Sequence, residues 1–201
     1  DAKYSAMRER SVGLGVMGLH SFLQKNSIPF ESVMSKVWNS KIFKHIQTHV
    51  DQASKKLADE RGSCPDAEEY GFKERFSNKT AIAPTASISI ICGGASPGVE
   101  PIAANSYTHK TLSGSYNVKN KYLREILQRY GKDNDKIWGT ITTNQGSVSH
   151  LDFLTNHEKY VFKTAFELDQ KWIVELGAER TPYVSQAQSI NIFLPADVHK
   201  K

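Results

Sequence analysis

The chain has 201 residues, of which 39% are hydrophobic and 23% are charged, and its formal net charge at pH 7 is +5. This length is enough for one domain with a real core, and the composition falls slightly on the polar side of an ordinary globular protein. A positive charge suits an anionic ligand such as a nucleotide, but it suits nucleic acid equally well. The basic residues are dispersed, which indicates solvated helix faces rather than a basic tail.

Cysteine usage and hydropathy predict a soluble cytoplasmic protein. Cys64 and Cys92 are far apart and form no Cys-x-x-Cys pattern, so neither a disulfide framework nor a zinc site is expected. No signal peptide opens the chain, and no apolar run approaches the roughly 18 residues needed to span a membrane. The absent initiator Met and a strand-like segment, residues 189–194, close to the C-terminus favour a piece cut from a longer chain.

Apolar residues recur at helical spacing in two segments of the N-terminal third. Residues 12–23 are expected to form a helix with Ser11 as its N-cap. Residues 31–61 are expected to form a long amphipathic helix that ends at Gly62, with Pro65 beyond it. The first ten residues also have a helical pattern.

The rest of the chain predicts further helices and a few short buried strands, the pattern of a partial α/β unit. Residues 93–98 form a loop of small residues, and Gly177 is expected to cap a helix. The predicted strands are residues 80–83 and 187–194, and the predicted helices are residues 119–130, 135–143 and 157–176.

One segment, residues 84–88, has the pattern of an anion site. It follows the predicted strand 80–83 at the point where a helix is expected to begin. The first N–H groups of a helix lack partners within it and carry partial positive charge. Small side chains let a phosphate approach the backbone, and the hydroxyls of Thr85, Ser87 and Ser89 can donate further hydrogen bonds. The alternative is an ordinary Thr/Ser N-cap without a ligand.

The glycines Gly13, Gly15 and Gly18 match the G-x-G-x-x-G pattern of dinucleotide-binding proteins. That motif needs a buried strand before it, so that the turn aims a helix N-terminus at the pyrophosphate. The preceding residues 7–10 are mostly charged and unlike a buried strand. Close packing of a helix is therefore the favoured explanation of the spacing.

Three further features favour structural interpretations. His45 and His49 lie one helical turn apart, but the glutamate of a zinc-binding HExxH motif is absent, so a surface helix is expected. Cys64 is expected to be a packing residue. Glu100 follows the glycine-rich loop and is expected to bond backbone N–H groups and hold that loop.

Four segments, in order along nearly the whole chain, resemble the large subunit of class I ribonucleotide reductases. The most specific combination is Pro-Thr-Ala-Ser followed by Gly-Val-Glu-Pro. The four segments are residues 8–24, 57–65, 78–123 and 163–195.

The resemblance implies a fold and a binding site. The fold is an α/β barrel of ten strands, of which residues 1–201 are expected to be a single fragment, truncated at both ends. The residues expected to bind the substrate diphosphate are Pro84, Thr85, Ala86, Ser87 and Ile88. Relatives carry a small or hydroxylated residue where this chain has Ile88, so that position is expected to offer only its backbone N–H.

The resemblance also implies a reaction, the reduction of ribonucleoside diphosphates to deoxyribonucleoside diphosphates for DNA precursor synthesis. The radical cysteine, the substrate-reducing cysteines and the tyrosine pair that receives the radical belong to segments outside this chain. Neither Cys64 nor Cys92 matches a redox cysteine, so no catalytic and no metal-binding residue is assigned. The isolated chain is expected to be inactive and to bind no cofactor of its own.

The expected partners follow from the same resemblance. They are the ribonucleoside diphosphate substrate, the remainder of a homodimeric large subunit, a small subunit whose metal cofactor generates the radical, and thioredoxin or glutaredoxin as dithiol reductant. ATP and deoxynucleoside triphosphates are the expected effectors, and neither nucleic acid nor a membrane is an expected partner.

Two other interpretations remain open from the sequence. A cobalamin-dependent ribonucleotide reductase shares the barrel. A free-standing basic nucleotide-binding module would fold and bind by itself, with a salt dependence that reflects several phosphates. The chain lacks the aromatic-basic interleaving of RNA-binding modules.

Overall fold

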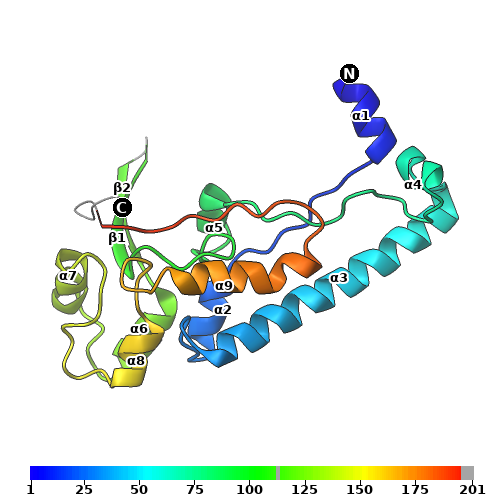
Figure 1. Cartoon of the computed structure of the whole chain (residues 1–201). Helices are drawn as coiled ribbons and strands as arrows, with labels where there is room; N and C mark the ends of the chain where they lie inside the picture. The colour runs from blue at the N-terminus through cyan, green and yellow to red at the C-terminus, as the bar shows by residue number, and fades with distance from the viewer. Residues whose placement is uncertain (112–113, 196–201) are drawn as a thin grey trace. The chain divides into compact units, whose positions relative to one another are not determined.

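The computed structural model describes residues 1–111 and 114–195, and it is mostly helical (Figure 1). The helices are α1 (Ala2–Glu9), α2 (Leu19–Lys25), α3 (Val33–Arg61), α4 (Pro65–Glu69), α5 (Ala86–Ile91), α6 (Lys121–Arg129), α7 (Asp135–Thr143), α8 (Asn156–Val161) and α9 (Lys171–Arg180), with a 3-10 turn at Thr181–Tyr183. Strands β1 (Ser106–Thr111) and β2 (Gly114–Lys119) form an antiparallel hairpin in which Ser106 pairs with Lys119. None of the helices described is long and apolar enough to cross a membrane.

The chain divides into two compact units. Among the described residues, the first unit comprises residues 1–16, 36–84 and 174–189, and the second comprises residues 17–35, 85–111, 114–173 and 190–195.

Several predicted helices are confirmed. The long helix α3 ends at Arg61, and Gly62 follows it with a φ of 79°, the left-handed conformation that glycine adopts without strain. Helix α7 has the predicted bounds, and α6 lies within the predicted range. Both begin at asparagine N-caps whose side chains accept backbone N–H groups, at Asn120 and Asn134.

The predicted helix at residues 12–23 is wrong in its first half. Leu14 pairs with Thr80 in an isolated parallel bridge, and the N–H group of Leu14 donates to the carbonyl of Lys79. A Cβ on Gly15 would lie 2.8 Å from the Ala81 carbonyl oxygen, so the two backbones approach too closely for any other residue. The helix begins only at Leu19, because backbone pairing with a distant segment overrides the helical periodicity.

Two other predictions need correction. Residues 157–176 form the separate helices α8 and α9, because the Thr164 N–H donates to the Glu167 carboxylate and the Ala165 N–H to the Ile102 carbonyl. Gly177 lies within α9 and does not end it.

The predicted strands at residues 80–83 and 187–194 are reduced to isolated parallel bridges, one between Ile82 and Gln188 and the other between Thr80 and Leu14. In the part of the chain that the structure describes, the hairpin β1–β2 is the one sheet, and it was not predicted. The partial ten-stranded barrel is therefore not visible here as a set of strands.

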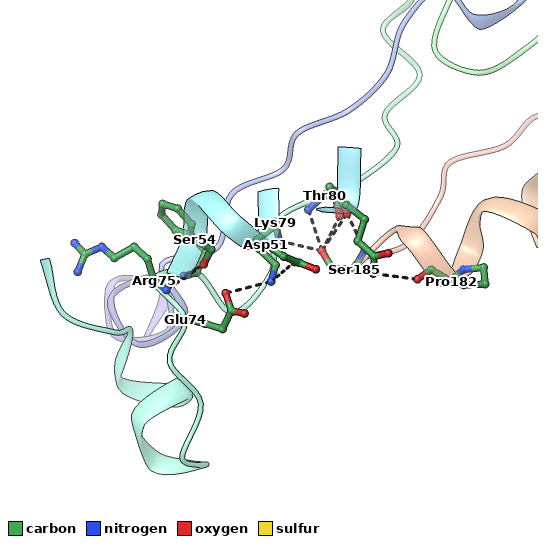
Figure 2. Close-up of polar contacts among 10 residues, drawn as sticks. Asp51, Ser54, Glu74, Arg75, Lys79, Thr80, Pro182 and Ser185 are labelled. Atoms are coloured by element: carbon green, nitrogen blue, oxygen red, sulfur yellow. Dashed lines mark hydrogen bonds and ion pairs between the residues drawn. The ribbon is translucent and has the colours of Figure 1, made fainter. Parts of the chain in front are cut away.

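In the first unit, polar contacts join the segment that leads to residue 84 to its neighbours. Figure 2 shows Thr80 facing Ser185. The Ser185 hydroxyl oxygen lies 2.9 Å from the N–H groups of both Lys79 and Thr80, and the Ser185 N–H donates to the Thr80 hydroxyl at 2.8 Å. These bonds hold the two extended segments together where no regular strand forms.

The Lys79 ammonium lies beside them, 2.6 Å from Asp51 and 3.3 Å from Glu74 (Figure 2). Burial by itself would lower the pKa of Lys79. The hydrogen bond to Asp51 and the charges of both carboxylates outweigh burial, so the pKa is raised and the side chain remains charged.

The second unit contains a hydrophobic cluster around α6 and α7. Helix α8 begins with a capping box, in which Thr155 and Glu158 satisfy each other's backbone N–H groups. The buried members of the cluster are Leu123, Ile126, Leu127, Trp138, Ile141, Val148, Leu151, Leu154, Val161 and Phe162.

Candidate functional site

The predicted anion-binding segment lies where α5 begins. Thr85 is the N-cap of this helix and has a left-handed backbone, with a φ of 52°. Such a conformation is unfavourable for a β-branched residue by about 1 kcal/mol or more. Strained residues of this kind persist where the surroundings hold them and occur often at binding sites.

Contacts with the glycine-rich loop hold Thr85 in this conformation. Its hydroxyl oxygen accepts the Gly98 N–H at 2.7 Å, and the Ala95 N–H donates back to the Ser89 carbonyl at 3.1 Å. The loop 93–98 therefore folds back along α5. Since the Thr85 hydroxyl accepts this bond, its proton remains available to a ligand.

The same loop is anchored to the start of α2. The Ser96 N–H donates to the Ser21 hydroxyl at 2.8 Å, and the Ser21 N–H donates to the Ser96 hydroxyl at 3.1 Å. Both serines are buried. This reciprocal pair has no local sequence signal, because its members are separated by 75 positions.

The hydroxyls predicted to donate to an anion differ in availability. Ser87 is exposed at the first turn of α5, and no hydrogen bond of its side chain occurs within residues 1–111 and 114–195. Ser89 is buried, and its hydroxyl donates to the Ala86 carbonyl at 2.8 Å. The expectation that Ser89 donates to a ligand is therefore wrong, since its proton is already engaged within the helix.

The remaining members of the segment offer backbone groups rather than side chains. Pro84, Ala86 and Ile88 are exposed, and Pro84 has no N–H to offer. The N–H groups at the first turn of a helix lack intrahelical acceptors. An anion at this turn can therefore be held by backbone N–H groups of α5 and the hydroxyls of Thr85 and Ser87.

Glu100 has the kind of contact that the sequence predicts. It is 5% exposed, and its Oε1 accepts the Asn191 backbone N–H at 2.8 Å. The Asn191 side-chain amide donates to both carboxylate oxygens, at 2.9 and 3.1 Å. Glu100 thus fastens the end of the loop to residue 191 within the second unit.

The other motifs have structural roles in the described residues. Gly13 and Gly15 pack on Ala81 in extended backbone, so the spacing is not that of a strand–turn–helix motif. His49 bonds the His45 carbonyl on an exposed face of α3. No group of three or more metal-ligating side chains occurs in the described part of the chain.

The two cysteines differ in burial. Cys64 is fully buried, which confirms the packing role, whereas Cys92 is exposed at the end of α5.

His20 is a buried titratable group that the sequence did not single out. Its Nδ1 accepts the Ile102 N–H at 3.0 Å, so the ring is neutral with its proton on Nε2. Burial lowers the pKa of His20 to about 3 and outweighs the opposing effect of the nearby Val161 backbone. Within residues 1–111 and 114–195 the buried Nε2 has no hydrogen-bond partner. His20 therefore holds the second unit together as a neutral ring and is not suited to bind an anion by charge.

Comparison with known proteins identifies the family. The family described as "Ribonucleotide reductase, barrel domain" matches residues 1–74 and 66–201. The chain belongs to this family. This agrees with the resemblance found in the sequence.

Members and a solved structure of this family show how much of a complete protein the chain represents. The ribonucleoside-diphosphate reductase large subunit of Invertebrate iridescent virus 6 is 48% identical over 98% of this chain, which covers 21% of that protein. A putative large subunit of Frog virus 3 (isolate Goorha) is 41% identical over 98% of the chain and 34% of its own length.

The structure of the Actinobacillus ureae class Id ribonucleotide reductase alpha subunit is also similar. It matches with a TM-score of 0.86 and 41% identity, over 94% of this chain and 34% of that protein. The chain therefore spans between about a fifth and a third of the relatives it matches.

Proposed function

We propose that this chain is part of the large subunit of a ribonucleoside-diphosphate reductase, which reduces ribonucleoside diphosphates to deoxyribonucleoside diphosphates. Within that enzyme it contributes to the wall of a ten-stranded α/β barrel and binds the substrate diphosphate. The observation that carries the proposal is the start of α5, where Thr85 is held in a left-handed conformation before the exposed residues Ala86, Ser87 and Ile88. Membership of the barrel-domain family supports it.

The diphosphate lies, in this proposal, against the first turn of α5. Backbone N–H groups there carry partial positive charge, and α5 has no acidic residue in its first turn to compete with an anion. The hydroxyls of Thr85 and Ser87 add hydrogen bonds to a charged acceptor. The Gly98 N–H bond fixes the Thr85 side chain before the ligand arrives, which reduces the entropic cost of binding.

The chemistry itself is supplied from elsewhere in this proposal. The radical comes from a small subunit with a metal cofactor, electrons come from a dithiol protein such as thioredoxin or glutaredoxin, and ATP and deoxynucleoside triphosphates act as effectors on the homodimeric large subunit. The present residues bind and position substrate, so the chain by itself is expected to turn over no substrate. The compartment proposed for the enzyme is the cytoplasm.

The test is a pair of substitutions in the complete large subunit, assayed with its small subunit and reductant. Thr85→Ala combined with Ser87→Ala should raise KM for the nucleoside diphosphate. Each lost bond to a charged group is worth about 1.5–3 kcal/mol, so the double variant should lose roughly 3–6 kcal/mol of binding. The value of kcat should change much less than KM, because these hydroxyls do not touch the reacting carbon in this proposal.

Ser87→Ala is the cleaner single variant, because Ser87 is exposed and its side chain makes no hydrogen bond within the described residues. Thr85→Ser is the matched control, since it keeps a hydroxyl for both Gly98 and the ligand. An unchanged KM in the double variant would contradict diphosphate binding at this turn. If Thr85→Ser raised KM as much as Thr85→Ala, the increase in KM would come from altered packing of the loop 93–98 and not from the loss of a hydroxyl that binds the ligand.

A further inference from the structure

A cavity of about 450 Å³ lies within the second unit, between α2, α5, the loop 93–98 and the base of the hairpin. Its volume is within the range of pockets that hold small organic ligands. The walls are mainly apolar and aromatic, and they include Ala86, Ile90, Ala103, Tyr107 and Tyr122. The proposed diphosphate position uses the first turn of α5, and this cavity adjoins it at Ala86 and continues along the side of the helix that carries Ile90.

One polar side chain in the wall, Gln24, is 3% exposed. Its Oε1 accepts the Asn120 Nδ2 group at 2.9 Å. Its Nε2 is buried and has no acceptor within residues 1–111 and 114–195. A buried amide N–H without an acceptor is unfavourable, and native proteins leave few such groups unexplained.

The orientation of the Gln24 amide is fixed by its neighbours. The Asn120 Oδ1 atom accepts the N–H groups of Tyr122 and Leu123 as the N-cap of α6, so Asn120 must present its Nδ2 group to Gln24. Asn120 Nδ2 also donates to Asn105 Oδ1 at 2.9 Å.

Asn105 is fixed in turn, because its own amide donates to two backbone carbonyls. If the oxygen and nitrogen of the Gln24 amide were exchanged, its NH2 group would face the NH2 group of Asn120, and two donors cannot bond each other. Nε2 is therefore the Gln24 atom that lacks a partner among the described residues.

We propose that this cavity binds a small planar aromatic molecule whose hydrogen-bond acceptor, a carbonyl oxygen or ring nitrogen, receives the Gln24 Nε2–H. The apolar wall fits an aromatic body, and the single unpaired donor fits a single acceptor. The ligand is neutral or anionic, because the cationic side chains Lys119 and Lys121 also line the cavity. This site adjoins the proposed diphosphate position at Ala86, but the argument for it rests on Gln24 and the apolar wall and does not depend on diphosphate binding.

A matched pair of probes, quinoline and naphthalene, tests the proposal. They have nearly the same shape, but only quinoline carries a ring nitrogen that accepts a hydrogen bond. The full chain is labelled with carbon-13 at isoleucine and alanine methyl groups and titrated by NMR. Quinoline should shift the methyl signals of Ile90, Ile102 and Ala103, which line the cavity, and leave that of the core residue Ile141 unchanged. It should bind about three- to tenfold more tightly than naphthalene.

Two variants separate the cavity from the donor. Gln24→Met keeps the length of the side chain without the N–H, so the preference for quinoline should vanish while naphthalene binding persists. Ala103→Trp adds a large side chain at an exposed position of the wall and should abolish binding of both probes.

The proposal is overturned if neither probe shifts the cavity methyl signals, or if Gln24→Met retains the preference. If either variant fails to fold, the wild-type chain still decides the question. Quinoline should shift the nitrogen-15 signal of the Gln24 side-chain amide, and naphthalene should not. An unmoved amide signal with quinoline bound would mean that a water molecule, and not the ligand, pairs with Gln24.

Discussion

In the first unit, segments that are far apart in the sequence meet through polar groups, whereas the second unit buries a cluster of ten apolar side chains. Ser185 alone accepts two backbone N–H groups of the segment 79–80. In the second unit, Leu123, Leu127 and Ile141 are fully buried by helices that pack through their apolar faces. The contacts of the first unit depend on individual hydrogen bonds, whereas the cluster of the second unit depends on how well the apolar side chains fill the space between the helices.

The largest expected effect is a cavity in the core of the second unit. Leu127→Ala should lower the free energy of unfolding by about 2–5 kcal/mol, because Leu127 is fully buried and its removal leaves space that the neighbours fill only in part. Urea denaturation followed by circular dichroism measures this. Glu125→Ala, at an exposed position of the same helix, is the control and should stay within about 0.5 kcal/mol of the wild type. A loss below 1 kcal/mol in Leu127→Ala would mean that this cluster does not stabilise the unit.

The second prediction concerns pH and His20. Burial lowers its pKa to about 3, whereas an unfolded chain protonates histidine near 6.5. Between about pH 3 and about pH 6.5, His20 is protonated in the unfolded chain but neutral in the folded one, so protonation favours unfolding. The stability that neutral His20 confers is therefore fully present above about pH 6.5 and is lost as the pH falls. Lowering the pH from 7 to 5 should reduce the free energy of unfolding by about 2 kcal/mol through this group.

The control for the pH experiment is His20→Gln, measured by urea denaturation over the same pH range. Because a glutamine side chain does not titrate, the pH dependence that arises from His20 should disappear in this variant, even if the variant is less stable at every pH. An identical slope in both proteins would show that His20 is protonated in the folded state at pH 5.

The third prediction concerns the polar contacts of the first unit. Ser185→Ala removes the acceptor of the Lys79 and Thr80 N–H groups and should destabilise the protein by about 1–3 kcal/mol. Thr48→Ala is the matched control, because its exposed hydroxyl bonds only within its own helix, to the Lys44 carbonyl. If both variants lose equal stability in thermal unfolding, the contact shown in Figure 2 contributes nothing specific.

The smallest expected effect is the loss of a helix cap. Asn134→Ala removes the acceptor for the Ile137 N–H at the first turn of α7 and should cost about 1 kcal/mol. Asn134→Asp keeps that acceptor at the same exposed position and is the control. Equal unfolding midpoints for these two variants would show that the cap contributes nothing to stability.

The sequence by itself determined those parts of the protein that depend on neighbouring residues. Helices α3, α6 and α7 were predicted because the apolar spacing and a stop signal such as Gly62 act within a few residues. The start of α5 at the segment 84–88 was predicted for the same reason, since small residues at a helix start are a local signal.

Only the tertiary structure decided the features that join distant positions. Residues 12–18 are not helical because Leu14 pairs with Thr80. The Ser89 hydroxyl is not available to a ligand because it is buried and donates to the Ala86 carbonyl within α5. Thr85 is oriented by Gly98. Within the described residues, Gln24 Nε2 lacks an acceptor because Asn120 and Asn105 fix the orientation of the Gln24 amide. Such contacts are set by which backbone groups meet after folding, and helical or strand periodicity carries no information about partners tens of residues away.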